Sequence, residues 1–241
     1  MTLICAMIGQ DNQECWPTAV RSLAGAVDHI LCIDGGSNDD TIPRIKAAAG
    51  STPITILSEP YDQHDRMMNG RQRNKYLEYI KKNWPDSWVL VMDADEVASD
   101  NIFMLKKVLE TLEPGVWNVH MEHLVYCYGL VDATLPKHFT PGRLFKITEG
   151  MEYPLSEHPV LVGALRVGMG RDFDGITIWH LAYTQGMNAL KKRYEYHIEK
   201  SEMHTPKQLR DWYCMHTRGE FPVRKINTDE LPRPLREAVH L

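Results

Sequence analysis

The sequence predicts an α/β protein whose central, mostly parallel sheet is covered by helices on both faces. Two patterns in the first 100 residues indicate this class. Short apolar runs alternate with segments of helical spacing, and the short runs stay apolar throughout instead of alternating with polar residues. Strands buried on both faces have the second pattern, and strand–helix alternation is typical of parallel sheets. With 241 residues, 43% of them hydrophobic, the chain can bury a sizeable core.

Each element of the first half has its own local signal. The predicted strands are the apolar runs at 3–8, 29–34, 54–57 and 87–92. Helical spacing between turn residues predicts helices at 17–27, 41–50 and 71–84. In the first of these helices, Ala19, Val20, Leu23 and Val27 fall on one side, so we expect that side to face the core.

The pattern becomes mixed after residue 100. Strand-like runs occur at 116–128, 142–147 and 159–167, and another leads to His180. The stretch 170–175, with glycine at both ends, reads as a loop. A helix is predicted over 187–202, and a tail rich in proline and aromatic residues follows. We therefore expect a smaller mixed part beside the parallel sheet and then a helical tail.

Composition narrows the functional class. No apolar run reaches the roughly 18 residues of a membrane span, and the first residues contain no basic leader, so we expect a cytoplasmic protein without a transmembrane segment. The five cysteines are odd in number and never spaced as Cys-x-x-Cys, which predicts reduced, mostly buried thiols. The net charge is −5, but residues 186–241 carry 11 Lys and Arg against 8 Asp and Glu. This tail is either a solvated helical surface or a region that meets an anionic partner.

Acidic residues end two of the predicted strands. The run at 29–34 ends at Asp34, and the apolar run at 87–92 leads into Asp93, Asp95 and Glu96. In open α/β sheets, ligands bind at the carboxyl ends of the strands. Asp93 and Asp95 project to the same side of an extended segment and can bind one divalent cation through hard oxygens. The alternative is an acidic helix N-terminus. A second Asp-x-Asp, Asp172 to Asp174, lies in the predicted glycine-flanked loop.

The order of these motifs resembles the inverting glycosyltransferases of family 2, which have the GT-A fold. The resemblance lies in "HILCIDGGSNDDT", then "RQRN", then "WVLVMDADE", and covers about the first 100 residues. The matching positions are Asp34, Gly36, Ser37, Asp39, Thr41, Arg73, Asn74, Asp93, Asp95 and Glu96. A weaker likeness continues in "GRLFKITEGMEYPLSEHPVL" and in "IWHLAYTQ".

The resemblance implies a role for each part of the chain. It implies one GT-A-like domain over 1–241, with a nucleotide-sugar-binding half at 1–118, an acceptor-side half at 119–185 and a helical tail at 186–241. Asp34 would hydrogen-bond the nucleoside, and Asp93 would hold the ribose or the surroundings of the metal.

The donor implied is a nucleotide-diphosphate sugar, with Mn²⁺ or Mg²⁺ on its diphosphate. Asp95 would bind the metal, and Arg73 could contact the phosphates, although a solvated helix arginine is the alternative. His180 could be a further metal ligand, which would favour Mn²⁺. His120 and His123 are interpreted as structural because residues three apart on a strand face opposite ways.

Inversion at the sugar carbon needs a carboxylate that takes the proton of the acceptor hydroxyl. Glu157, in a proline-bounded loop, is the first candidate, and Asp172 and Asp174 are the next. The alternative for each of the three is an ordinary surface acid.

Other functions remain open at this point. A phosphatase of the haloacid dehalogenase type also runs an apolar strand into Asp-x-Asp, with Asp93 as nucleophile and Asp95 as acid and base. More than 90 residues precede the motif here, whereas that family places it near the start of the chain. A non-catalytic binding protein is a further alternative. For a transferase, the acceptor would be a small molecule, an oligosaccharide, a protein or a hydroxylated base in DNA, and the oligomeric state is open.

Overall fold

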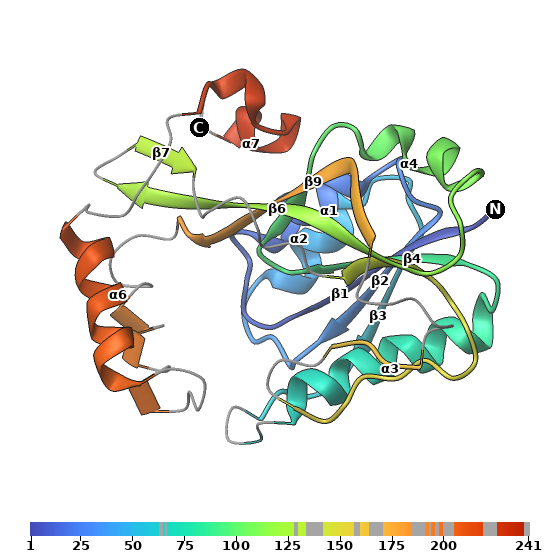
Figure 1. Ribbon diagram of the computed structural model, residues 1–241, viewed down its shortest axis with the longest axis horizontal. Helices are drawn as coiled ribbons and strands as arrows, with labels where there is room; N and C mark the ends of the chain where they lie inside the picture. Colours follow the sequence, from blue (N-terminus) through green and yellow to red (C-terminus); the bar gives the residue numbers. More distant parts are fainter. Residues whose placement is uncertain are drawn as a thin grey trace.

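A sheet of nine strands organises the computed structural model of the protein (Figure 1). The structure describes residues 1–62, 65, 67–127, 130–133, 142–156, 160–163, 171–184, 191–192, 194–195, 198–199, 205–218 and 226–238. The strands lie in the order β3-β2-β1-β4-β8-β6-β9-β5, and β7 pairs with β6. Their bounds are β1 (Leu3–Gly9), β2 (His29–Asp34), β3 (Ile54–Ser58), β4 (Trp88–Asp93), β5 (Glu96–Ala98), β6 (Val116–Cys127), β7 (Leu130–Ala133), β8 (Gly142–Lys146) and β9 (Arg171–Tyr183). The helices are α1 (Trp16–Leu23), α2 (Thr41–Ala48), α3 (Met68–Asn83), α4 (Ile102–Leu109), α6 (Pro206–Arg218) and α7 (Arg233–Ala238), with a short 3₁₀ helix at Thr228–Glu230.

The first four strands of the fold form the predicted parallel half of the sheet. β3, β2, β1 and β4 pair in parallel, and helices follow β1, β2 and β3 along the chain. The register pairs Gly9 with Asp34 and Ile8 with Asp93, so the carboxyl ends of β1, β2 and β4 lie level. The α/β class is confirmed, and the acids that end β2 and β4 share one edge.

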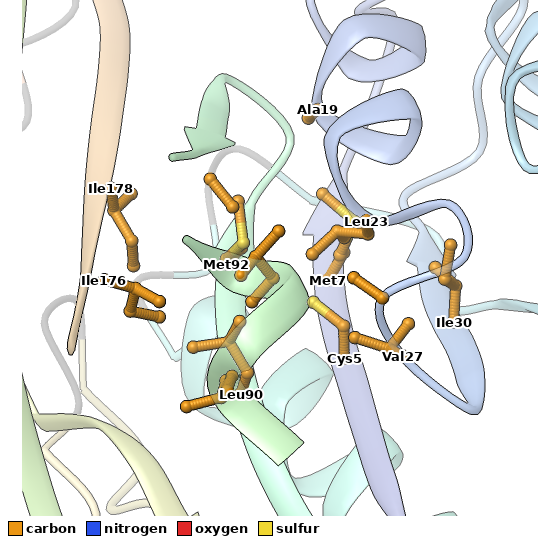
Figure 2. Packing of buried hydrophobic residues seen from close by; sticks show 14 of the residues in the cluster. Cys5, Met7, Ala19, Leu23, Val27, Ile30, Leu90, Met92, Ile176 and Ile178 are labelled. Carbon is orange, nitrogen blue, oxygen red and sulfur yellow. The ribbon is translucent and has the colours of Figure 1, made fainter. Parts of the chain in front are cut away.

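Alternate residues of the central strands supply two cores on opposite faces of the sheet. On one face the β1 residues Leu3, Cys5 and Met7 pack in a cluster with residues of α1, α2 and α4. Figure 2 shows part of this cluster, with Cys5 and Met7 of β1 near Leu23 of α1. On the other face Ile4 and Ala6 pack in a cluster with residues of α3. The strands are therefore apolar on both sides because both sides are covered. The four α1-region residues predicted to face the core are all buried, namely Ala19, Val20, Leu23 and Val27.

The second half of the sheet mixes strand directions. β8 pairs antiparallel with β4 and β6, β9 pairs in parallel with β6, and β5 pairs antiparallel with β9. The predicted boundary at residue 118 falls inside β6, so the two proposed halves share a continuous strand. The loop prediction at 170–175 is wrong from Arg171 onward, because these residues begin β9, where a register irregularity accommodates extra residues. Within 160–163 the predicted strand is reduced to an isolated bridge between Val162 and Glu152.

The C-terminal segments meet the sheet differently. Leu231, which precedes α7, and Leu235, which lies in it, join a small cluster with Trp179 and Leu181 of β9. α6 is drawn to one side of the sheet in Figure 1, and Tyr213 on it stacks on Tyr194 with ring centroids 4.5 Å apart. Across the described residues, none of the helices has both the length and the apolar character that spanning a membrane requires.

Candidate active site at the carboxyl end of β4

A tight turn after β4 carries the acidic cluster to the edge of the sheet. β4 ends at Asp93, Ala94 and Asp95 form the turn, and Glu96 begins β5. The end of β1 leaves room for it, since a Cβ added to Gly9 would lie 2.5 Å from the Cβ of Ala94. Real Cβ atoms do not approach so closely, so glycine at position 9 is what allows the turn to pack directly on β1.

Two arginines from different elements pair with the acids at the ends of this turn. Arg73 of α3 donates to Asp93 Oδ1 over 2.7 Å. Arg143 of β8 donates from Nη2 to Asp93 Oδ2 over 3.1 Å and to Glu96 Oε1 over 2.6 Å. Glu96 Oε2 also accepts the backbone N–H of Asp93 over 2.7 Å. We call these four side chains, Arg73, Asp93, Glu96 and Arg143, the arginine–carboxylate quartet.

Burial and charge act in opposite directions on the carboxylates of the quartet. Burial acts to raise the pKa of Asp93, but Arg143 and Arg73 outweigh it and hold that pKa well below its usual range. Burial raises the pKa of Glu96 to about 7, against the opposing charge of Arg143 and with a further rise from Asp93. Asp93 is therefore an ionised carboxylate whose two oxygens both have cationic partners.

Asp95 lies on the same turn but has a different partner. Its Oδ2 lies 3.3 Å from Nε2 of His180 on β9. The strand registers place Glu96 opposite His180 on one side and His123 opposite it on the other, with the two imidazole centroids 4.8 Å apart. The side chains of Asp95 and His180 are 16% and 19% exposed, whereas that of Glu96 is 1% exposed. The Asp95–His180 pair is thus more accessible than Glu96, while the Asp93 side chain, at 29%, is the most exposed of the three acids.

The chemistry of Asp95 and His180 suits a divalent cation, and the structure brings these two predicted metal ligands together. A carboxylate oxygen and an imidazole nitrogen are donors that Mn²⁺ accepts, with ligand and water oxygens for its other positions. Among the described residues, no three His, Cys, Asp or Glu side chains are grouped so as to hold a metal ion. Within the described part of the chain, these two side chains would need further donors, which a substrate and water can supply.

A segment that leads toward Glu157 is fixed next to Arg73. Asn74 Nδ2 donates to the Tyr153 carbonyl oxygen, and the Tyr153 N–H donates to Asn74 Oδ1, both over 2.8 Å. The Arg73 guanidinium carbon lies 5.9 Å from the centroid of the Tyr153 ring. Glu157 itself lies outside the described residues. Tyr153, four residues before Glu157, is held against α3, the helix that carries Arg73.

Asp34 ends β2 as predicted, and its carboxylate is engaged by its own loop. It accepts hydrogen bonds from the backbone N–H of Gly36 and from the N–H and hydroxyl of Ser37, at 2.6 to 3.2 Å. The Asp34 residue is 7% exposed. A carboxylate offers about four lone-pair sites, and these three donors engage most of them, with the Ser37 N–H shared between both oxygens. The contacts shape the loop after β2, and a direct hydrogen bond from Asp34 to a nucleoside stays a prediction.

Asp172 and Asp174 are not brought into the cluster. Both are exposed and lie near the start of β9, where Asp172 Oδ1 accepts a hydrogen bond from Asn118 over 3.2 Å. On β6, Asn118 pairs with Asp172 and His123 pairs with His180, so the two β9 residues are separated by the length of five β6 residues. At about 3.3 Å per residue, Asp172 is roughly 17 Å from His180. This placement argues against either acid as the base beside Asp95.

One residue of the cluster, Arg143, was missed as a candidate in the sequence, and another, His123, was interpreted as structural. Arg143 stands in the apolar strand "GRLFKI", and a buried arginine in such a strand requires an acidic partner. Three acids at 93–96 with Arg73 as the one assigned cation signalled that a second cation was needed. His123 is 6% exposed, and its contact with His180 depends on the pairing of two strands that are more than 40 residues apart in the chain.

No protein-family model matches the chain, and no curated protein matches it. Among solved structures, S. aureus TarS 1–349 in complex with UDP is 15% identical, with a TM-score of 0.42, over 52% of this chain and 36% of that one. A further structure of S. aureus TarS 1–349 is 10% identical, with a TM-score of 0.48, over 87% of this chain and 68% of that one.

Glucosyl-3-phosphoglycerate synthase from Mycobacterium tuberculosis, in complex with Mg²⁺ and UDP, is 18% identical, with a TM-score of 0.35, over 50% of this chain and 43% of that one. The chain thus spans less than half the length of the TarS–UDP and synthase structures. At these identities and TM-scores the likenesses decide neither the fold nor the activity of this chain.

Proposed function

We propose that the chain is a glycosyltransferase of family 2 with the GT-A fold, which moves a sugar from a nucleotide-diphosphate sugar to a hydroxyl acceptor with inversion. One observation carries the proposal. Asp95 and His180, 85 residues apart in sequence, meet at 3.3 Å on the edge where β2 and β4 end in Asp34 and Asp93. That edge is where open α/β sheets bind their ligands.

The donor would bind across the level carboxyl ends of β1, β2 and β4. The loop after β2, which Asp34 shapes, would hold the nucleoside. Asp93 would contribute to the ribose side of the site while its charge is balanced by Arg73 and Arg143. Because Arg73 is engaged with Asp93, we assign it to fixing that carboxylate in preference to a direct contact with the phosphates.

Asp95 and His180 would hold a Mn²⁺ or Mg²⁺ ion on the diphosphate. Such an ion, when bound, neutralises the charge that develops on a departing diphosphate. The residues of this chain orient the site: the turn fixes Asp95, and β9 fixes His180 beside it. A carboxylate–imidazole pair favours Mn²⁺ over Mg²⁺, since imidazole is a poor ligand for Mg²⁺.

Glu157 is the proposed base. The transfer requires a carboxylate within reach of the acceptor hydroxyl, and the hydroxyl proton would pass to it as the oxygen attacks the sugar carbon. Asn74 holds the segment that leads to Glu157 next to Arg73. Asp172 and Asp174 are poorer candidates because of their distance from His180.

The contacts of Asp93 in the arginine–carboxylate quartet argue against the phosphatase alternative. A nucleophilic Asp93 needs a carboxylate oxygen that is free to attack phosphorus. Both oxygens of Asp93 are instead engaged by guanidinium groups.

The acceptor class stays open among a small molecule, an oligosaccharide, a protein and a hydroxylated DNA base. The net charge of −5 speaks against tight non-specific DNA binding, which depends on several phosphate contacts.

The test is a panel of nucleotide-diphosphate sugars incubated with the protein and Mn²⁺, with release of nucleoside diphosphate as the readout. We expect release with at least one donor, its abolition by a chelator, and its loss in Asp95→Asn. Phosphate release from p-nitrophenyl phosphate, without nucleoside diphosphate release from any donor, would replace the proposal with the phosphatase.

A further inference from the structure

Arg143 joins the two ends of the turn that carries Asp95. It lies on β8, the neighbour of β4, and its side chain is 11% exposed. Its Nη2 reaches both Asp93 Oδ2 and Glu96 Oε1. Asp93 is the last residue of β4 and Glu96 the first of β5, so one guanidinium nitrogen bridges the two strands across the turn.

Hydrogen bonds and packing hold the turn at several points. The backbone N–H of Asp93 donates to Glu96 Oε2 over 2.7 Å, and the N–H of Leu181 donates to the Asp95 carbonyl oxygen over 2.7 Å. Ala94 packs against Gly9 at the end of β1. With Asp93 and Glu96 tied together, the direction of the Asp95 side chain depends on how firmly those ends are held.

Arg73 and Arg143 differ in how they hold the ends of the turn. Within the quartet, Arg73 hydrogen-bonds to Asp93, from α3 on one face of the sheet. Arg143 links the carboxylates of Asp93 and Glu96, in addition to the direct hydrogen bond from the Asp93 N–H to Glu96. Its Nε is buried and has no hydrogen-bond partner among the described residues, so Arg143 is held in place chiefly by the two carboxylates. Burying an arginine with an unsatisfied N–H costs stability, and the two charge-assisted contacts offset that cost.

We propose that Arg143 is a positioning residue for the metal ligand Asp95: by bridging Asp93 and Glu96 it holds the turn so that the Asp95 carboxylate faces His180. The inference rests on the proposed function, since it assumes that Asp95 and His180 bind a cation. Partners that orient metal ligands typically change metal affinity about 10- to 100-fold when removed. The competing account is that Arg143 only balances the charge of two buried acids.

A charge-balanced double variant separates the two accounts. Arg143→Met combined with Glu96→Gln, compared with the wild type at a pH well above 7 so that Glu96 is ionised, removes one positive and one negative group. The net charge of the cluster is then unchanged, while the bridge between β8 and the turn is lost. If Arg143 positions Asp95, the double variant folds and binds Mn²⁺ about 10-fold or more weakly than the wild type. If Arg143 only balances charge, the double variant binds Mn²⁺ with the affinity of the wild type.

The measurement is a titration with Mn²⁺ alone, in which electron paramagnetic resonance reports the free ion, alongside thermal melting of each protein. The matched control is Arg171→Met with Glu113→Gln, which removes an exposed Arg–Glu ion pair in the same chain. We expect the control to keep wild-type Mn²⁺ affinity. Weakened binding in the control as well would show that loss of any such pair suffices, and would overturn the inference.

The remaining outcomes are also decisive. A folded double variant with wild-type Mn²⁺ affinity overturns the positioning role. If the double variant does not fold, Arg143→Lys decides, because lysine keeps the charge but lacks the planar fork of donors. We expect weakened Mn²⁺ binding there too, and unchanged binding would overturn the role. A wild-type protein that does not bind Mn²⁺ would instead remove the proposed metal site itself.

Discussion

Asp93 and Asp95 stand two residues apart on one turn, and their carboxylates are balanced in opposite ways. Asp93 is paired from within the fold, by Arg73 on one oxygen and Arg143 on the other. Asp95 has the imidazole of His180 beside it at 3.3 Å, a group whose charge depends on protonation. The first acid is therefore neutralised by the protein, and we propose that the second shares its charge with a bound cation.

The comparison shows that an Asp-x-Asp pattern need not mean two equivalent metal ligands. In an extended segment both side chains would lie on one side, but Asp95 lies in a turn, and the neighbours that each acid meets decide its role. Here α3 and β8 bring guanidinium groups to Asp93, while β9 brings His180 to Asp95. The predictions below test this division of roles, from the largest expected effect to the smallest.

Asp95→Asn is expected to lower sugar transfer about 1000-fold while changing the free energy of unfolding by less than about 1 kcal/mol. A bound metal supplies several kcal/mol of charge stabilisation in the transition state, and about 4 kcal/mol corresponds to 1000-fold. Steady-state kinetics with Mn²⁺ and urea unfolding measure the two quantities. Asp86→Asn, an exposed change before β4 and at the opposite end of that strand from Asp93, is the control and should retain transfer. Equal losses in both variants would contradict the assignment of Asp95.

Arg73→Met is expected to lower the free energy of unfolding by about 3 kcal/mol, because it leaves Asp93 partly buried with one cationic partner removed. Combining it with Asp93→Asn should recover at least half of that loss, since the uncompensated charge disappears. Urea unfolding of the wild type, both single variants and the double variant gives the coupling directly. Strictly additive effects would show that Arg73 and Asp93 do not stabilise each other.

Glu157→Gln is expected to lower transfer about 100-fold and to leave donor binding within about twofold of the wild type, because glutamine keeps the shape and loses the basicity. Calorimetric titration with the donor and steady-state transfer assays separate binding from chemistry. Near-normal transfer in this variant would exclude Glu157 as the base. Loss of transfer in Asp172→Asn or Asp174→Asn would move the role to that acid.

Gly9→Ala is expected to destabilise the fold by about 2 kcal/mol, since the added methyl would lie 2.5 Å from the Cβ of Ala94. The turn would have to shift, so Mn²⁺ binding should weaken as well. Gly150→Ala is the control, because its new Cβ would make only an ordinary contact, 3.5 Å from the Gly163 carbonyl oxygen. Similar melting temperatures for the two variants would mean that β1 does not constrain the turn.

The parallel half of the fold could be predicted because its signals are local. The second strand runs over His29–Asp34 as predicted, since an unbroken apolar run is followed directly by turn residues. β9 begins at Arg171, inside the stretch predicted as a loop, because its pairing with β6 overrides the glycines at either side. Pairing between strands far apart in the chain leaves no comparable pattern in the sequence.

The candidate site divides in the same way. Asp34 and Asp93 were predictable as strand-ending acids, and the family resemblance proposed Asp95 and His180 as partners. What the sequence could not supply was which cation meets which acid. Arg143 is 47 residues from Glu96, and only the antiparallel pairing of β8 with β4 brings it beside the turn.

The most direct test of the division between the two acids is a crystal grown with Mn²⁺ and a nucleoside diphosphate, with the ion located by its anomalous scattering. The account predicts one Mn²⁺ within bonding distance of a carboxylate oxygen of Asp95 and an imidazole nitrogen of His180, with Asp93 still paired to Arg73 and Arg143. A Mn²⁺ ion bound by Asp93 with its arginine contacts broken, or no ion at this edge of the sheet, would contradict it.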